Sequence, residues 1–249
     1  MRTIVYGNGK SRQKWNVNEK LDDDIVTWGC NRIFNDVKVD NLVAMDCHIQ
    51  HMVYASGYAK ENRCWFADWI VNPQDFREDL RYMHIYPIVN NMIEIKVSGE
   101  FIENEKGTRT KFVVKGKDEG PYQGMYCTWV DDYDRVEYIE YPRGWCSGTT
   151  AIHLACQQGA TEIYLMGFDL SENPINSVYE KEQDGQKMRS DPNVFCHRPD
   201  WEQEMKTVIN EFRDRQFIWV EPHGDTMKFD VSNLTYDTYE NVRKKLCQE

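Results

Sequence analysis

The chain has 249 residues, of which 41% are hydrophobic and 29% charged, as in a soluble globular protein with one large domain or two small ones. Forty-one acidic residues against 30 basic ones give a net charge of −11, which argues against a broad nonspecific nucleic-acid surface. No apolar run approaches the roughly 18–20 residues that span a membrane, and no signal peptide is visible before the first predicted strand. We therefore expect a cytoplasmic protein with no membrane span, whose scattered cysteines, none of them in a CxxC pair, are reduced.

Three short β-prone runs near the N-terminus each end on a small or polar residue. They are predicted at 3–6, 25–28 and 42–45, and they lead into Gly7-Asn8-Gly9, Gly29-Cys30-Asn31 and Asp46. If the strands are parallel neighbours, Asn8, Asn31 and Asp46 gather on one edge of the sheet. Ligands of open α/β sheets bind beyond the carboxyl ends of the strands.

The stretch from Ser147 to Asp169 has the pattern of one helix–turn–strand unit. Ser147 and Gly148 open a helix whose apolar residues are three or four positions apart, and Gly159 ends it because a helix C-terminus favours positive φ. The run 163–166 predicts a buried parallel strand, with Asp169 just past its carboxyl end. The helix start and the carboxylate are two walls of a plausible nucleotide site, and an ordinary crossover without a ligand is the alternative.

The other segments complete a single domain over 1–249. Helices are predicted at 47–59, 73–82, 199–214 and 238–246, and further strands at 63–70 and 217–220. The region from about 91 to 141 is interpreted as a β-rich insertion with a hairpin of 93–102 and 111–114. The polar stretch from 170 to about 197 is predicted to be a lid, because loops longer than about 15 residues are uncommon unless functional or disordered.

Together these elements predict an α/β fold. We expect a Rossmann-like, mainly parallel sheet with helices on both faces, plus the β-rich insertion and the lid loop.

Three familiar ligand motifs are only partly matched. Gly9-Lys10-Ser11 invites a P-loop interpretation, but Ile4 stands where that pattern needs a glycine. Arg12 likewise occupies the third glycine position of a dinucleotide fingerprint. His48 and His51 have a metal-binding spacing, but no nearby carboxylate completes a zinc motif, so no metal site is predicted.

Four segments, in their order along the chain, resemble the bacterial lipooligosaccharide sialyltransferases of glycosyltransferase family 42. They are Gly7-Asn8-Gly9-Lys10-Ser11, Cys30-Asn31, Ser147-Gly148 running to Gly167-Phe168-Asp169, and Cys196-His197. The region from 60 to 140 matches poorly. A family of Rossmann-like pterin diphosphokinase proteins shares the opening glycine-asparagine loop.

The resemblance implies an inverting, metal-independent glycosyltransferase that needs no cofactor. It would transfer a sugar from a CMP- or UDP-linked donor to a hydroxyl acceptor, expected to be a glycan. Asn8 and Asn31 would contact the nucleotide and its phosphate, Asp169 the ribose or base, and His197 would be the general base. Independently of the family, an imidazole with a pKa of about 6.5 suits proton abstraction near neutral pH, although a helix-capping His197 is the alternative.

Other donor-binding candidates come from the same comparison. Ser147 and Gly148 would hold the donor at a helix start, where the dipole favours an anion. Lys10 replaces a proline of the family and Asp46 an asparagine, and Ser171 and Tyr179 fall near its two phosphate-binding tyrosines. Arg143 is either a phosphate cation or a solvated side chain. The donor-binding candidates are Gly7, Asn8, Gly9, Lys10, Asn31, Asp46, Arg143, Ser147, Gly148, Asp169, Ser171 and Tyr179.

Two rival functions remain open at this stage. One is a Mg²⁺-dependent diphosphokinase or nucleotidyltransferase of the pterin diphosphokinase-like type, and the other is a non-catalytic nucleotide-binding module. The sequence also leaves a homo-oligomer open.

Overall fold

A computed structural model gives the fold of the chain. The residues that it describes are 1–46, 49–50, 52–53, 56–67, 112–113, 128–129, 135–139, 143, 145–170, 178–179, 198–222 and 229–248. The predicted helix at 73–82, most of the β-rich insertion and most of the lid lie outside these residues.

The chain forms two compact units. The first comprises Met1–Val43, Arg143–Glu182 and Met188–Glu249, and the second comprises Ala44–Pro142 and Gln183–Lys187. The organisation predicted from the sequence, one domain with an insertion and a lid, stays a prediction.

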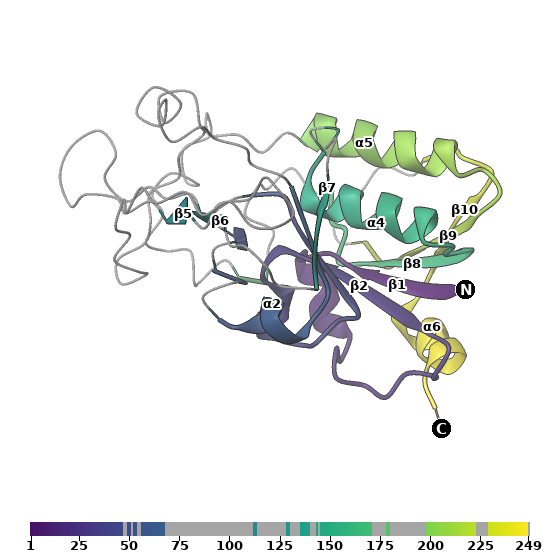
Figure 1. The fold of residues 1–249 in the computed structure, drawn as a ribbon. Helices are drawn as coiled ribbons and strands as arrows, with labels where there is room; N and C mark the ends of the chain where they lie inside the picture. Colours follow the sequence, from purple (N-terminus) through teal and green to yellow (C-terminus); the bar gives the residue numbers. More distant parts are fainter. Residues whose placement is uncertain are drawn as a thin grey trace. The chain divides into compact units, whose positions relative to one another are not determined.

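A parallel sheet forms the centre of the first unit (Figure 1). Its strands lie in the order β10-β9-β8-β1-β2-β3, and the pairings of β1 with β2 and β8, of β2 with β3, and of β9 with β8 and β10 are all parallel. The chain therefore winds outward in both directions from β1 and β8, as in doubly wound nucleotide-binding sheets, whose ligand crevice lies where the order reverses. The strands are β1 (Arg2–Tyr6), β2 (Val26–Cys30), β3 (Asn41–Ala44), β8 (Glu162–Met166), β9 (Gln216–Val220) and β10 (Leu234–Asp237).

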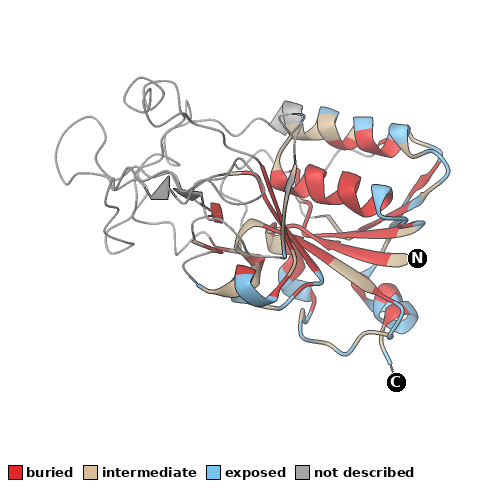
Figure 2. Cartoon of the chain, viewed as in Figure 1, coloured by how far each residue is buried: buried red, intermediate tan, exposed pale blue. Residues whose placement is uncertain are grey.

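Helices cover both faces of this sheet. Helices α4 (Ser147–Gln157) and α5 (Arg198–Glu211) lie on one face and α6 (Tyr239–Leu246) on the other (Figure 1). The central strands are buried almost throughout, as is α4, whereas α6 is exposed on its outer side (Figure 2). The predicted Rossmann-like α/β fold, with a mainly parallel sheet and helices on both faces, is confirmed.

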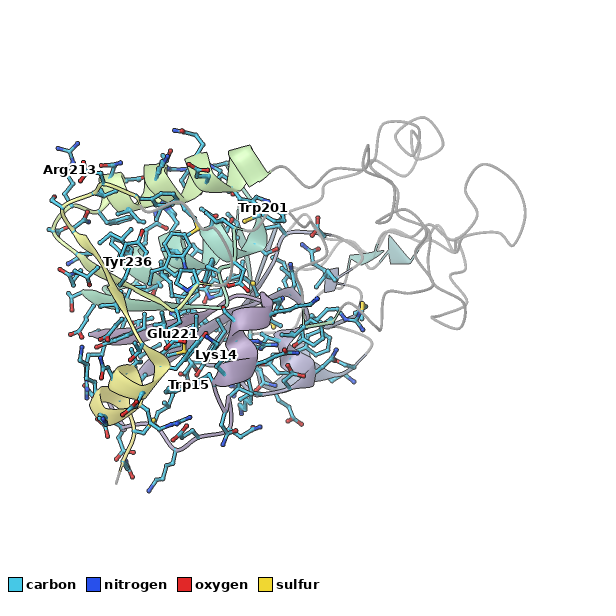
Figure 3. All side chains as sticks on the ribbon, turned by 180° about the vertical axis from the view of Figure 1, so that it is seen from behind. Lys14, Trp15, Trp201, Arg213, Glu221 and Tyr236 are labelled. Atoms are coloured by element: carbon cyan, nitrogen blue, oxygen red, sulfur yellow. The ribbon has the colours of Figure 1, made fainter. Side chains whose placement is uncertain are left out.

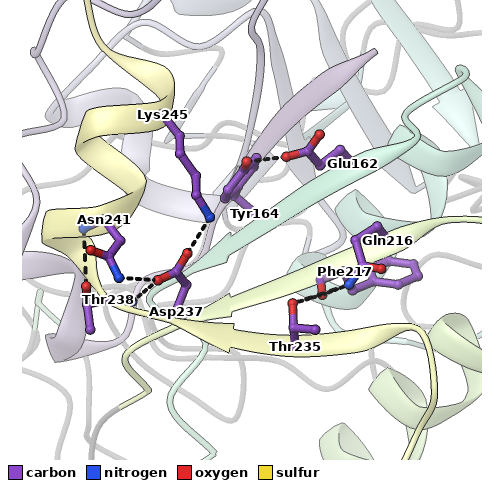
Figure 4. Close-up of polar contacts among 9 residues, drawn as sticks. All are labelled: Glu162, Tyr164, Gln216, Phe217, Thr235, Asp237, Thr238, Asn241 and Lys245. Carbon is purple, nitrogen blue, oxygen red and sulfur yellow. Dashed lines mark hydrogen bonds and ion pairs between the residues drawn. The ribbon is translucent and has the colours of Figure 1, made fainter.

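Local chemistry explains where the helices of the first unit begin and end. Gly159 takes φ +95 just after α4, the left-handed conformation that the sequence predicted for it. Thr238 caps α6 by accepting from the Asn241 N at 3.2 Å (Figure 4). Asp237 ties the helix to the end of β10, accepting from the Asn241 Nδ2 at 2.9 Å and from the Lys245 Nζ at 2.7 Å.

Two short 3-10 helices follow β1 and β2. The first, η1 (Lys10–Lys14), replaces the loop expected after the opening glycines, and the second is η2 (Asn31–Asn35). Trp15, just after η1, packs against Tyr239 of α6 with ring centroids 6.1 Å apart. Lys14 donates to the Glu221 carboxylate at 2.7 Å, which links η1 to the end of β9 (Figure 3).

The described part of the second unit includes short strands and the short helix α2. Strands β4 (Cys64–Ala67) and β7 (Val136–Ile139) pair in parallel, and β5 (Phe112–Val113) pairs antiparallel with β6 (Thr128–Trp129). The helix predicted over 47–59 is not continuous. Gly57 takes φ +79 in a turn, and a separate helix, α2 (Tyr58–Glu61), begins after it.

The described helices include none that is both long and apolar enough to cross a bilayer.

Candidate functional site

The loop after β1 packs directly against the loop after β8. The Gly7 N donates to the Met166 O at 2.7 Å and the Gly9 N to the Gly167 O at 2.8 Å. A Cβ at Gly7 would lie 2.4 Å from the Gly167 O, and one at Gly9 would lie 2.6 Å from the Asp169 Oδ2. Both distances are below any real contact, so these glycines are needed for the close approach of two backbones.

Asp169 lies past the carboxyl end of β8, as the sequence predicts, and binds the neighbouring loop. Its Oδ2 accepts from the Ser11 N at 2.8 Å, near the start of η1. Lys10, which precedes Ser11 and is the first residue of η1, is half-buried. Asp169 therefore fixes the position of η1. The contact of Asp169 with a ribose or base stays a prediction.

Asn8 and Asn31 follow the ends of two neighbouring parallel strands, β1 and β2. The last pair of the register is Tyr6 with Gly29, and η2 begins at Asn31, just after the end of β2. The Asn8 Nδ2 donates to the Cys30 O at 2.9 Å, which holds the two strand ends together. The Oδ1 atoms of both asparagines are buried and have no hydrogen-bond partner among the described residues.

The backbone at Asn31 is strained. Its φ is +53, in the left-handed region, which asparagine tolerates better than most residues but which is uncommon outside glycine. Such conformations cost on the order of 1 kcal/mol and cluster at ligand sites. Together with the two unpartnered amide oxygens, this strain makes the paired ends of β1 and β2 the best candidate ligand site in the described part of the chain.

The sequence did not indicate a partly buried ionic cluster around Tyr179. Arg12 is 3% exposed, and its Nη2 donates to the Asp36 Oδ2 at 2.8 Å and to the Tyr179 OH at 3.0 Å. The Tyr179 hydroxyl in turn donates to the Asp36 Oδ2 at 2.6 Å. Burial raises the pKa of Tyr179, so its hydroxyl stays protonated at neutral pH. The Arg12 Nη1 is buried without a hydrogen-bond partner among the described residues.

This cluster fixes the position of residues 178–179 in the first unit. The Val178 N donates to the Asn8 O at 2.9 Å, so the backbone next to Tyr179 lies against the Asn8 loop. The Arg12 and Arg32 guanidinium groups lie 5.5 and 5.6 Å from the Tyr179 ring centroid, within the range of cation–π attraction. Tyr179 therefore lies near the predicted site, but in this structure its hydroxyl contacts Arg12 and Asp36.

The start of α4 already holds a carboxylate. The Glu204 Oε2, on α5, accepts from the Cys146 N at 3.0 Å. The Cys146 Sγ caps the helix by accepting from the Thr149 N at 3.4 Å. Ser147 is 3% exposed, and a Cβ at Gly148 would lie 3.0 Å from the Phe168 ring. An anion bound to the first N–H groups of α4 would therefore lie close to the Glu204 charge.

The Arg143 side chain contacts Glu211 of α5 and the nearby Trp145. Its Nη1 and Nη2 donate to the two oxygens of Glu211 at 2.6 and 3.0 Å, and its guanidinium lies 4.7 Å from the Trp145 ring centroid. Glu211 is also 3.9 Å from the Nδ1 of His153, a residue of α4. Burial first, and the Arg143 charge second, lower the pKa of His153, so it is neutral at pH 7. Arg143 therefore anchors the loop before α4 to α5.

Asp46, Ser171 and His197 are the remaining predicted site residues. Asp46 belongs to the second unit, where its carbonyl accepts from the Ile49 N and the Gln50 N at 3.0 Å. Ser171 and His197 lie outside the described residues, as do His48 and His51. Within the described residues, no three His, Cys, Asp or Glu side chains are grouped so that they could hold a metal.

Comparison with known proteins gives no relative for this chain. It matches no protein-family model, and no curated protein or solved structure is significantly similar to it.

Proposed function

We propose that the chain is an inverting, metal-independent glycosyltransferase of the sialyltransferase-like kind. It would transfer a sugar from a CMP- or UDP-linked donor to a hydroxyl acceptor, a glycan in our proposal. His197 takes the acceptor proton, the acceptor oxygen forms a bond to the anomeric carbon, and the bond from that carbon to the donor phosphate breaks. The nucleotide leaves with the electron pair, and Lys10 and the N-terminus of α4 stabilise its charge.

The observation that supports this proposal best is the pair of asparagines at the carboxyl ends of β1 and β2. Buried amide oxygens without partners each cost on the order of 1–3 kcal/mol, and here two of them follow neighbouring strands, one on a strained backbone. Such a cost is expected where a ligand later satisfies the groups. Their place on a doubly wound sheet favours a nucleotide as that ligand.

The first experiment is a binding panel followed by a turnover assay. CMP, UDP, GDP and ADP are added in a thermal-shift assay, in which a ligand at 100 times its Kd stabilises by about 2.7 kcal/mol. CMP-sialic acid and UDP-sugars are then incubated with lactose as the acceptor, with and without EDTA, and nucleotide release is measured. Release that persists in EDTA supports the transferase. Activity that needs Mg²⁺ and transfers a diphosphoryl or nucleotidyl group would establish the diphosphokinase-like alternative, and nucleotide binding without turnover would establish a binding module.

The second experiment tests the base. His197→Ala should lower kcat by about 10²–10⁴, the usual contribution of a positioned general base, and leave nucleotide affinity unchanged. His153→Ala is the matched control, because that imidazole packs between Trp145 and Phe212. Normal turnover in His197→Ala would leave that residue a helix cap and remove it from the mechanism.

A further inference from the structure

The hydrogen bonds of Asn8 show which of its side-chain atoms a ligand can use. Its Nδ2 is committed to the Cys30 O at 2.9 Å. Turning the amide over would set the Oδ1 against that carbonyl, two acceptors facing each other, so the hydrogen bond fixes the orientation. The Asn8 side-chain atom left without a hydrogen-bond partner is therefore an acceptor, the buried Oδ1.

Asn31 carries a second buried amide oxygen. Its Oδ1 is buried and has no partner among the described residues, and the residue follows the strand paired with β1. Adjacent strands are about 4.8 Å apart. The two amide oxygens therefore belong to residues at the ends of neighbouring strands.

We propose that Asn8 and Asn31 accept hydrogen bonds from the ribose hydroxyls of the bound nucleotide and do not contact its phosphate. The inference rests on the proposed function, because it takes a nucleotide as the ligand. Phosphate oxygens at neutral pH are chiefly acceptors and would face the amide oxygens with like partial charge. A ribose carries two O–H donors on neighbouring carbons, and each forms hydrogen bonds with an O···O distance of about 2.7–2.8 Å. A deoxynucleotide lacks one of these donors, so the site selects ribonucleotides over deoxynucleotides.

The test couples a change in the protein to a change in the ligand. The tightest ribonucleotide of the CMP, UDP, GDP and ADP panel is compared by calorimetry with its 2′-deoxy and 3′-deoxy forms. In the wild type, loss of the hydroxyl that Asn31 contacts should weaken binding about three- to tenfold, the value of one neutral hydrogen bond. In Asn31→Gly the same deoxy change should have no effect, because the partner atom has been removed. Glycine accepts the positive φ at this position, so the backbone is not strained further.

A second variant separates the ribose contact from a phosphate contact. Asn31→Asp keeps an oxygen acceptor and tolerates the left-handed backbone, but it adds a negative charge. Binding of the corresponding nucleoside, which has no phosphate, should be retained. Asn18→Gly, which changes an exposed loop asparagine, is the control for nonspecific effects.

Two results would overturn the inference, and they differ from failure of the proposed function. Equal binding of the ribose and both deoxy forms by the wild type would exclude a hydroxyl contact. Asn31→Asp that binds the nucleoside normally but loses the nucleotide at least tenfold would assign Asn31 to the phosphate. Either result leaves a nucleotide site in place, whereas a wild type that binds none of the four nucleotides ends the proposed function and this inference together.

Discussion

The paired ends of β1 and β2 and the start of α4 were both expected to hold one nucleotide, yet they are built differently. The strand ends offer acceptors without partners, the Oδ1 atoms of Asn8 and Asn31. At the start of α4, the Cys146 N donates to the Glu204 carboxylate and the Thr149 N to the Cys146 Sγ. The strand ends thus carry acceptors without hydrogen-bond partners, whereas the Cys146 and Thr149 N–H groups at the start of α4 already have partners within the protein.

Under the proposed function, the two regions would hold different parts of a nucleotide. Acceptors select ligand hydroxyl or N–H groups, whereas helix N-termini select anions. Under the proposed function, the phosphate would therefore lie toward the N-terminus of α4, where the Glu204 charge opposes it.

The largest effect is expected from a glycine change at the strand ends. In Gly7→Ala the new Cβ meets the Gly167 backbone at 2.4 Å, so the loop that carries Asn8 must move. We expect a loss of about 1–3 kcal/mol in the free energy of unfolding, as for other overpacked sites, together with a loss of nucleotide affinity. Urea unfolding and calorimetry measure the two effects.

Gly148→Ala is the matched change at the start of α4. Its Cβ would lie 3.0 Å from the edge of the Phe168 ring, a side chain that can tilt, and alanine is favoured in helices by up to about 1 kcal/mol. Little net change in stability is therefore expected. If both alanine variants unfold at the same urea concentration, the tight backbone packing assigned to the β1 loop is wrong.

The second effect concerns the Tyr179 hydroxyl. Tyr179→Phe removes a buried group that bonds to Asp36 and Arg12, and a buried cation is left with fewer partners. We expect a loss of about 1–3 kcal/mol in stability, with nucleotide affinity unchanged. Tyr236→Phe is the control, because its hydroxyl accepts from the Phe229 N in a more exposed place. A nucleotide affinity that falls tenfold would instead make Tyr179 a phosphate ligand, as the family resemblance implies.

The sequence predicted the strand ends well because the information there is local. Apolar runs that end on Asn8 and Asn31 identify two strands, and parallel pairing alone brings their carboxyl ends to one edge. The helix and strand around Gly159 were also predicted correctly, since a glycine between two periodic segments has few other interpretations.

Contacts between distant parts of the chain gave no such signal. Tyr179 is 167 residues from Arg12, and neither belongs to a motif that links them. Glu204 looks like one of many charges on a polar helix, although the structure turns it toward Cys146. Strand β10 was missed because its residues Thr235 and Tyr236 are exposed, so the short segment lacks the buried run by which the other strands were predicted.

The third effect is expected from removing the negative charge of Glu204 near the start of α4. Glu204→Gln keeps an oxygen that can accept from the Cys146 N but removes the negative charge. A unit charge near a helix N-terminus is worth about 0.3–1 kcal/mol, so nucleotide affinity should rise about two- to fivefold. Glu202→Gln is the control on the same helix, because Glu202 pairs with Lys206. No gain, or an equal gain in both variants, would place the phosphate away from α4.

The smallest effect is expected where Arg143 ties the α4 loop to α5. Hydrogen bonding to Arg143 is the largest contribution that lowers the pKa of Glu211 from its ordinary value of 4.5. A carboxylate whose pKa is lower in the folded state adds stability above about pH 4.5, and this contribution is lost as the pH falls through the folded value. The pair is more than a third exposed on the arginine side, so it is worth no more than about 0.5 kcal/mol. Glu211→Gln should therefore unfold slightly earlier in urea than the wild type at pH 7, and the difference should vanish near pH 3. A difference that stays constant between the two pH values would mean that Glu211 acts by packing alone, and the loop before α4 would then owe its position to Trp145 and His153.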